Sequence, residues 1–344
     1  MGSGKTTSFD IAHKAGVSQA TVSRALRDSP LVNPKTREHI KKIARELNYR
    51  VDRSAAGLRS QQSKTIALLL YEDPTTDDSQ INPFFLSMLG HITRIAAAHK
   101  YDVLMSFQQL SEDWLYEYQA SNRADGMILL GYGNFAHLAP KLVKLADEGA
   151  RFMIFGLSTA ELGGHTICGH NLEGGELATR HLVGLGRKRI VFLGDANDEH
   201  PEFKLRYEGY CQALREAGLP VDRQLLVNAK NQETAGYEAV ARLLESGLEF
   251  DALFAVTDLI AFGALKCLRK SGIKVPQDVS VVGFDDLPAA SYFSPSLTTI
   301  RQDTRLAAEA LVKNLIGIIN GEEVHSRQLP MSLEVRGSCG GRKP

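Results

Sequence analysis

The feature that most constrains the fold of this chain is a pair of short amphipathic helices, which meet at one glycine within residues 10–26. Gly16 stands where the turn between them needs a residue that tolerates positive φ. Ser18 is in position to cap the second helix. The apolar positions recur with helical spacing and predict one packed face: Ile11, Ala12, Ala15, Val17, Val22 and Leu26. The second helix then exposes Gln19, Ala20, Ser23 and Arg24.

This pattern is typical of a helix-turn-helix, whose second helix enters the major groove of DNA. A plain helical hairpin packed on a core is the alternative. The charge of the surrounding segment favours DNA. Residues 1–64 carry 13 basic residues (Lys and Arg) against 5 acidic ones (Asp and Glu), although the whole chain carries 40 basic and 40 acidic residues. A cationic head on a neutral chain suits a domain that neutralises phosphates, and a solvated basic surface is the simpler alternative.

With 344 residues, 43% of them hydrophobic, the chain exceeds one typical domain, so we expect a small head and a larger body. The cysteines, which we expect to be reduced and mostly buried, show no spacing typical of a zinc site: Cys168, Cys211, Cys267 and Cys339. Since neither a membrane span nor a signal peptide is evident, we expect a cytoplasmic protein.

The body alternates short β-branched runs with helical stretches after a polar segment at residues 59–64. We expect strands near residues 65–71, 101–107, 126–130, 152–155, 189–193, 252–256 and 279–284. Helices are expected near residues 84–100, 139–148, 175–185, 204–217, 234–246 and 259–271. This alternation predicts an α/β body, and the number of strands favours two doubly wound parallel-sheet lobes with a cleft between them.

Catalytic patterns have little support in this sequence. Residues 2–6 imitate the end of a phosphate-binding loop, but the pattern needs another glycine and a strand before it. Adjacent acids on loops point apart instead of flanking one bond, as at residues 285–286. No nucleophile elbow or metal-binding histidine pair occurs. We therefore expect no enzyme activity, no cofactor and no metal.

At the level of whole motifs, the chain resembles the LacI/GalR repressors. The head resembles the family at residues 10–26, at Val32 with residues 36–38, and at residues 46–49 and 55–58. The body resembles it at residues 82–85, 186–190, 206–210, 257–258, 282–286 and 298–300. The resemblance spans nearly the whole chain. It implies an all-α helix-turn-helix head on a body like a periplasmic binding protein.

The resemblance implies a DNA-binding domain at residues 1–50, a hinge and linker at 51–64, and an effector-binding and dimerisation domain at 65–344. The N-lobe would hold residues 65–168 and 303–329, and the C-lobe residues 169–302 and 330–344. Gln19 and Ala20 would contact bases, because an amide reads a base edge and a methyl contacts thymine. Arg24 would contact a base or a phosphate. The remaining contacts implied for the head are Thr7, Ser18, Thr21, Ser23, Asn33 and Thr36.

Residues 52–60 correspond to the family's hinge, which is too short to persist as an isolated helix and would fold on the operator. Leu58 would wedge between base pairs in the minor groove, with Ser54 and Ala55 nearby. Val51 and Asp52 replace the usual Pro-Asn pair, and this acid should weaken binding slightly.

The effector site implied by the resemblance lies between the lobes. Arg206 would grip ligand oxygens, and Asp285 would accept hydroxyl hydrogen bonds. Phe84 and Phe85 would offer an aromatic face to a sugar ring, or would belong to the core. Further cleft positions are Gly156, Asn231, Asp258 and Gln302. Asn231 stands where many relatives of the family have an aromatic residue, and Gly156 stands where some have an aspartate. These two departures leave room for a ligand larger than a monosaccharide.

The sequence therefore predicts a homodimeric repressor of carbohydrate-utilisation genes that leaves a palindromic operator when a sugar binds. Activation by a corepressor is an open alternative. A periplasmic-type solute-binding protein shares the two-lobed body, and a nucleotide-using enzyme would rest only on the truncated glycine loop. The tail at residues 337–344 carries no leucine heptads, so a dimer is expected and no tetramer.

Overall fold

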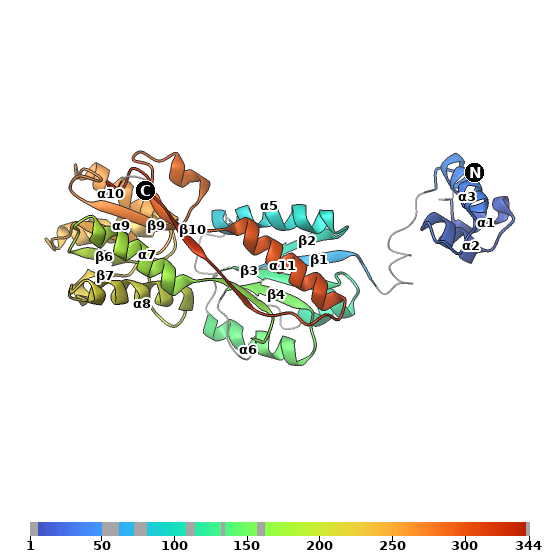
Figure 1. The fold of residues 1–344 in the computed structure, drawn as a ribbon, viewed down its shortest axis with the longest axis horizontal. Coiled ribbons are helices and arrows are strands. Elements are labelled where there is room, and N and C mark those ends of the chain that lie inside the picture. The colour runs from blue at the N-terminus through green and yellow to red at the C-terminus, as the bar shows by residue number, and fades with distance from the viewer. Residues whose placement is uncertain are drawn as a thin grey trace. The chain divides into compact units, whose positions relative to one another are not determined.

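Figure 1 presents the fold in a computed structural model that describes residues 6–49, 62–71, 81–107, 114–131, 135–156 and 162–341. Contacts divide the chain into two units, Met1–Ser63 and Lys64–Pro344, here termed the head and the body. The hinge residues for which we predict DNA contacts, Ser54, Ala55 and Leu58, lie outside the described residues.

The described head contains the helices α1 (Ser8–Ala15), α2 (Gln19–Leu26) and α3 (Pro34–Glu46). Gly16 ends α1 at φ +65°, in the left-handed region that favours glycine. The Ser18 hydroxyl accepts the Thr21 N–H at 3.2 Å and begins α2. The Asn33 carboxamide accepts the Lys35 N–H at 2.9 Å and begins α3, and Pro34 supplies a pre-set φ at its first position.

The predicted apolar face of the head forms its core. Ile11, Ala12 and Val22 are buried together with residues of α3 such as Ile40. The other predicted members, Ala15, Val17 and Leu26, are partly buried and pack against this core. The helix-turn-helix prediction for residues 10–26 is therefore confirmed.

The described strands of the body form two six-stranded sheets. The N-lobe sheet has the order β11-β5-β4-β3-β1-β2, and its paired strands are parallel. Its strands are β1 (Thr65–Leu70), β2 (Asp102–Phe107), β3 (Gly126–Leu130), β4 (Phe152–Phe155), β5 (Thr166–Gly169) and β11 (Arg327–Leu329). Because helices cover both faces, strands such as β3 are buried at every position.

The C-lobe sheet has the order β12-β10-β9-β8-β6-β7, in which only β12 runs antiparallel to its partner in the described pairing. Its strands are β6 (Ile190–Leu193), β7 (Leu226–Val227), β8 (Ala252–Ala255), β9 (Ser280–Asp285), β10 (Thr298–Gln302) and β12 (Met331–Glu334). The predicted fold of two doubly wound lobes is confirmed.

Helices flank both sheets (Figure 1). The N-lobe carries α5 (Pro83–Ala98), α6 (Phe135–Asp147) and α11 (Thr304–Ile319), together with a π-helix at Leu115–Ala120. The C-lobe carries α7 (Asn171–Gly184), α8 (Pro201–Glu216), α9 (Glu233–Glu245) and α10 (Asp258–Lys270), with short 3-10 helices at Arg223–Leu225 and Pro288–Ser291. Among the described residues, no helix combines the length and apolarity needed to span a bilayer.

The chain passes between the lobes after β5, after β10, and between β11 and β12. Strands β5 and β11 belong to the N-lobe sheet, and after each of them the chain enters the C-lobe. Strand β10 belongs to the C-lobe sheet, and after it the chain returns to the N-lobe. Parallel α/β sheets bind ligands at the carboxyl ends of their strands. The crossings therefore lie beside the edge at which a ligand site is expected.

Candidate functional site

A cavity of about 480 Å³ lies between the lobes. Helix α5 contributes residues spaced by three and four positions, which places them on one helical face. The carboxyl ends of β9 and β10 and the first turn of α11 form the other walls. The lining residues are Phe84, Ser87, His91, Asp285, Asp286, Leu287, Pro288, Arg301, Gln302, Asp303, Thr304 and Arg305. This volume suits a small-molecule ligand.

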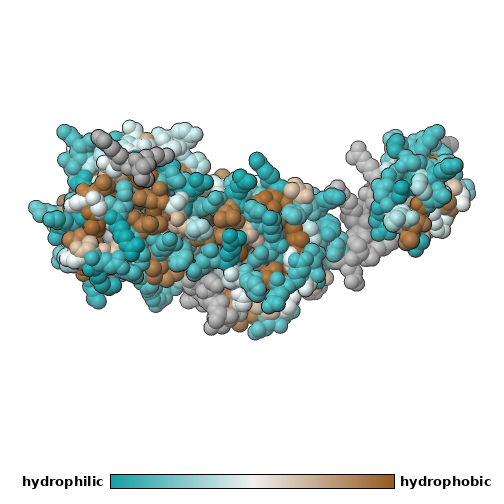
Figure 2. Space-filling view, in the orientation of Figure 1, coloured by the Kyte–Doolittle hydropathy of each residue, from teal (hydrophilic) through white to brown (hydrophobic). Residues whose placement is uncertain are grey.

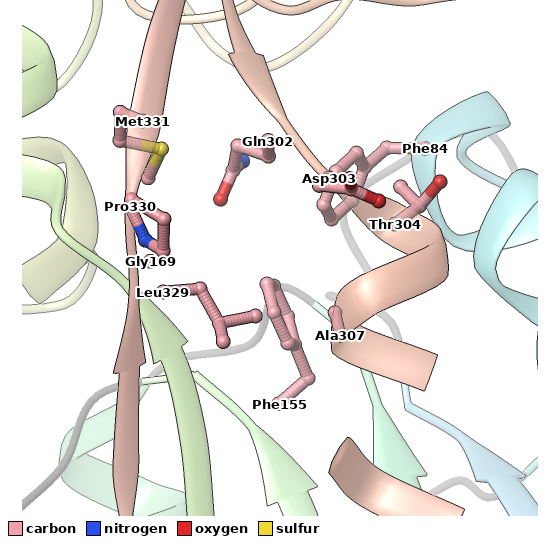
Figure 3. A pocket seen from close by; sticks show the side chains of 10 residues that line it. All are labelled: Phe84, Phe155, Gly169, Gln302, Asp303, Thr304, Ala307, Leu329, Pro330 and Met331. Carbon is pink, nitrogen blue, oxygen red and sulfur yellow. The ribbon is translucent and has the colours of Figure 1, made fainter. Parts of the chain in front are cut away.

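Gln302 also lines two much smaller spaces beside this cavity. In the first, Figure 3 shows its side chain between Met331 on the crossing segment and Phe84 on α5, with Phe155 facing the same space. The Phe84 and Phe155 rings lie 5.7 Å apart in a tilted arrangement. The second small space is lined by Gly156, Glu202 and Arg206, among others.

Arg206 is held rigidly at the wall of the second space, with only 1% of its surface exposed. Its Nε donates to Asn171 Oδ1 at 2.9 Å, and Nη1 donates to the Val256 carbonyl oxygen. The guanidinium lies 3.6 Å from the centroid of the Phe284 ring. Stacking and hydrogen bonds together satisfy a buried cation that would otherwise be costly.

Two glycines explain how Arg206 reaches this position. A Cβ on Gly175 would lie 2.1 Å from the Arg206 carbonyl oxygen, and a Cβ on Gly209 would lie 2.1 Å from the Leu172 carbonyl oxygen. Glycine therefore lets the backbones of α7 and α8 approach closely. This approach brings Asn171 at the start of α7 next to Arg206 on α8.

Asp285 ends β9 beside Arg206, with Oδ1 4.0 Å from Nη1. The Gln302 amide donates to the same carboxylate oxygen at 2.8 Å. Burial raises the Asp285 pKa to about 7, although Arg206 and the Gln302 hydrogen bond act in the opposite direction. Asp285 and Asp286 both have positive φ, at 113° and 56°, so the chain is strained where it enters the cleft.

Three other predicted effector residues do not line the cavities described above. Asp258 is fully buried and accepts hydrogen bonds from Thr299 Oγ1 at 2.6 Å and from the Leu287 N–H at 2.7 Å. Burial, reinforced by Asp285, raises its pKa well above the usual range. Asn231 is half-buried and accepts a hydrogen bond from the Thr257 hydroxyl, and Phe85 is buried with its ring edge-on to that of Phe84.

The surface of α2 forms the second candidate site. Ala20 and Arg24 are exposed, whereas Gln19, Thr21 and Ser23 are half-buried. The Gln19 amide donates to Ser8 Oγ at 2.7 Å, and Arg27 donates to Ser23.

The other head residues predicted to contact DNA lie around α2. Thr7 is exposed at the start of α1 and donates to Asp10, whose pKa these bonds lower. Ser18 and Asn33 are exposed helix caps, and Thr36 on α3 is half-buried.

Comparison with known proteins decides the family. The model of the lacI family of bacterial regulatory proteins matches residues 9–52, and that of a periplasmic binding protein-like domain matches residues 179–339. The transcriptional repressor CytR of Escherichia coli K12 is 32% identical over 345 residues, which cover 96% of each chain. The chain belongs to the LacI family.

Further relatives of this LacI-family chain are regulators too. RegA of Clostridium saccharobutylicum is 31% identical and covers 93% of this chain and 94% of its own. A lac repressor dimer bound to operator and an anti-inducer has a TM-score of 0.83 at 25% identity, covering 97% of this chain and 99% of that one. A CelR–cellobiose complex has a TM-score of 0.71 at 29% identity, with the same coverage. The LacI-family chain is therefore a transcriptional regulator with a DNA-binding head and an effector-binding body.

The second small space of this LacI-family regulator is lined by a residue that we did not predict from the sequence, Glu202. A Cβ on Gly156 would lie 3.1 Å from Glu202 Oε1, so a C-lobe carboxylate reaches the N-lobe wall where Gly156 leaves space. Glu202 and Arg206 are four residues apart on α8, and this spacing puts them on one face. That spacing was a usable signal once Arg206 had been identified.

Proposed function

We propose that this regulator represses carbohydrate-utilisation genes: it binds a palindromic operator as a homodimer and releases it when a sugar occupies the interlobe cleft. The pairing of Arg206 with Asp285 at the cleft carries this proposal. A planar donor fork beside a carboxylate acceptor suits a ligand with several hydroxyl groups. Phe84, which lines the large cavity and one small space, offers an aromatic face to a sugar ring.

The head supports specific DNA binding. Ala20 and Arg24 are exposed on α2, where a methyl group and a guanidinium can reach base edges. Ser18 and Asn33 cap their helices, and helix N-termini are common phosphate-contacting groups in DNA complexes. The lac repressor dimer is a structural relative that was solved on its operator. Minor-groove contacts by Ser54, Ala55 and Leu58 remain part of the proposal.

The N-lobe supports dimerisation. Strand β2 lies at the edge of its sheet and exposes Met105 (43%) and Phe107 (56%). Leu86 on α5, a helix that contacts β2, is 51% exposed. Figure 2 shows hydrophobic residues reaching the surface of the body amid mostly hydrophilic ones. Burying such an edge and patch against a second copy removes apolar surface from water.

Release requires that the sugar prefer the released conformation. Moving a population from 99:1 to 1:99 takes about 10⁴-fold differential affinity, or about 5.5 kcal/mol, shared between two cleft sites. A ligand that prefers the operator-bound form would act as a corepressor with the same cleft. We further propose that the protein acts by binding alone, without catalysis or a cofactor, in the cytoplasm where bacterial DNA lies.

The test is operator affinity of the purified full chain, measured with and without a panel of mono-, di- and oligosaccharides. We expect at least one sugar to weaken operator binding strongly. Tighter binding would establish a corepressor instead. Sugar binding by a protein with no preference for any symmetric duplex would support a solute-binding protein and overturn the proposal.

Arg206→Ala tests the cleft directly. We expect this variant to lose the response to the sugar while it retains operator binding, because the head does not depend on Arg206 for its core. Arg180→Ala is the matched control, since Arg180 is itself exposed and forms ion pairs with Glu176 and Glu216 on α7 and α8. Equal loss of both activities in Arg206→Ala would show that Arg206 is structural.

A further inference from the structure

We propose that Ser8 is a positioning residue for DNA sequence recognition: it holds the Gln19 carboxamide so that its free edge selects adenine at one position of each operator half-site. This inference rests on the proposed DNA-binding function and adds the identity of one base and of the residue that fixes it. Ser8 belongs to α1 and not to the recognition helix α2.

The contact that carries the inference joins the first residues of the two helices. Gln19 Nε2 donates to Ser8 Oγ at 2.7 Å, and both side chains are half-buried. Both residues are the first of their helices, each directly after a capping residue, so neither backbone can shift without disturbing a cap. Gln19 thereby loses the rotamer freedom that a long amide side chain normally keeps, and less entropy is lost when it meets DNA.

The hydrogen bond leaves a defined edge on Gln19. Its amide nitrogen has two hydrogens, and one is used by Ser8. The second N–H and Oε1 form no hydrogen bond with any residue in the described ranges of the chain. This edge has one donor beside one acceptor.

Adenine matches that edge in the major groove. It presents an acceptor at N7 beside a donor at N6, and glutamine pairs with both atoms. Guanine presents two acceptors, N7 and O6, so Oε1 would face an acceptor. If the amide were turned over, Oε1 would accept from the Ser8 hydroxyl through one of its two lone pairs, and the free edge would hold the same donor and acceptor in the reverse order. Ser8 therefore fixes the order in which donor and acceptor follow each other along the edge that meets adenine.

The experiment measures base preference for the full-length chain. The wild-type protein selects sites from a randomised symmetric duplex, and its affinity is then measured on duplexes substituted one base pair at a time. The position read by Gln19 is the one whose preference disappears in Gln19→Ala. We expect adenine there, with roughly tenfold discrimination over the other bases.

Variants of Ser8 separate positioning from folding. Ser8→Ala should lose most of the adenine preference at that position and keep the preferences at other positions, whereas Ser8→Thr should restore it. Ser8→Asp offers only acceptors, so it should keep the amide orientation and the adenine preference while lowering affinity for all sequences alike. Thr6→Val is the matched control, because the Thr6 hydroxyl donates to the Leu47 carbonyl oxygen and not to Gln19.

Three results would overturn the inference. An unchanged base profile in Ser8→Ala would show that Ser8 does not position Gln19. A preference for guanine at the Gln19 position would show that Gln19 does not present a donor beside an acceptor to the DNA. Equal weakening at every position in Ser8→Ala, with no rescue by Ser8→Thr, would show a purely structural role. A wild-type protein without any sequence preference would instead refute the proposed function itself.

Discussion

At the scale of single residues, two carboxylates near Arg206, those of Asp285 and Glu202, have unlike surroundings. Asp285 is buried, and its nearest Arg206 nitrogen lies 4.0 Å away, beyond a hydrogen bond. Desolvation therefore outweighs the attraction of the guanidinium and raises the Asp285 pKa to about 7. Glu202 instead lies against the space left by Gly156. Each carboxylate gives a separate prediction.

Asp285→Asn should change how stability depends on pH. An aspartate whose folded-state pKa is about 7 binds more protons in the folded than in the unfolded chain between about pH 4 and pH 7. Wild-type stability should therefore fall across this window as pH rises, and the variant should lack this contribution. Urea unfolding at several pH values should show that the free energy of unfolding of the variant rises relative to that of wild type up to pH 7 and that the difference is constant above it. A difference independent of pH would contradict the assignment.

Gly156→Asp should impair effector binding through Glu202. The new carboxylate would stand close to Glu202 Oε1, because even its Cβ would be only 3.1 Å away. We expect about a tenfold loss of affinity for the releasing sugar, as like charges repel in a partly desolvated cleft. Calorimetry should show a smaller loss for the uncharged Gly156→Asn and partial recovery when Glu202→Gln is added to Gly156→Asp. Equal losses for the Asp and Asn variants would point to size and not charge.

Some residues of the family motifs line the cavities between the lobes, and others do not. Arg206, Asp285, Gln302 and Phe84, for which we predicted effector contacts, all line the cavities between the lobes. The sequence did not reveal Asn171, because its contact with Arg206 depends on the close approach of α7 to α8. Nor does a motif show on which side of a wall a residue such as Asp258 faces.

At the scale of elements, the turn between α1 and α2 sets the geometry of the head. Gly16 adopts φ +65°, and nothing lies within 4 Å of the place where a Cβ would stand. The requirement for glycine is therefore conformational and not steric. Backbone geometry at this one position controls the angle at which α2 leaves α1.

Gly16→Ala should therefore destabilise the head by about 1 kcal/mol, since an L-residue is disfavoured at this φ. Gly16→Asn should cost less, because asparagine tolerates the left-handed region better. Hydrogen exchange of the α1 and α2 amides in the full chain measures local opening, while exchange in β8 reports on the body. No difference between the Ala and Asn variants would argue against a conformational cause.

Several described elements have no counterpart among the predicted strands and helices. Helix α11 carried ordinary local signals, namely Asp303 before its first residue and Gly321 after its end, and needed no tertiary information. Strands β5, β10 and β12 were not predicted either, and β7 and β11 have only two and three residues, too few for a period to be recognised. β11 pairs with β5, about 160 residues earlier, so only the folded sheet defines it.

At the scale of the whole molecule, pairing of two copies should determine operator affinity. A symmetric operator is bound by two heads at once, and separated heads lose the advantage of the second contact. The exposed edge at β2 is the described surface that best suits this pairing.

Phe107→Asp should shift the protein from dimer to monomer, because it places a charge on the edge strand β2, which also exposes Met105. Sedimentation velocity should show the smaller species, and operator affinity should fall by at least tenfold. Tyr292→Asp is the control, since Tyr292 is 86% exposed on the C-lobe. A dimer that survives Phe107→Asp would place the interface elsewhere.

The division into a head and a two-lobed body followed from charge and from the alternation of strands and helices. These patterns did not predict which strand belongs to which sheet. The chain crosses between the lobes three times, so strands far apart in sequence lie in the same sheet. Charge and periodicity are local properties, whereas membership of a sheet is decided by pairing.

The late crossings also affect how the protein is made. The N-lobe sheet needs β11 at Arg327–Leu329, and the C-lobe sheet needs β12 at Met331–Glu334. During translation, neither lobe can therefore be completed until residues 327–334 have been made, whereas the head precedes them in the chain and has a core of its own. A nascent chain thus holds a folded DNA-binding head before its effector-binding body is complete, and we expect termination before residue 327 to yield a product that does not respond to the effector.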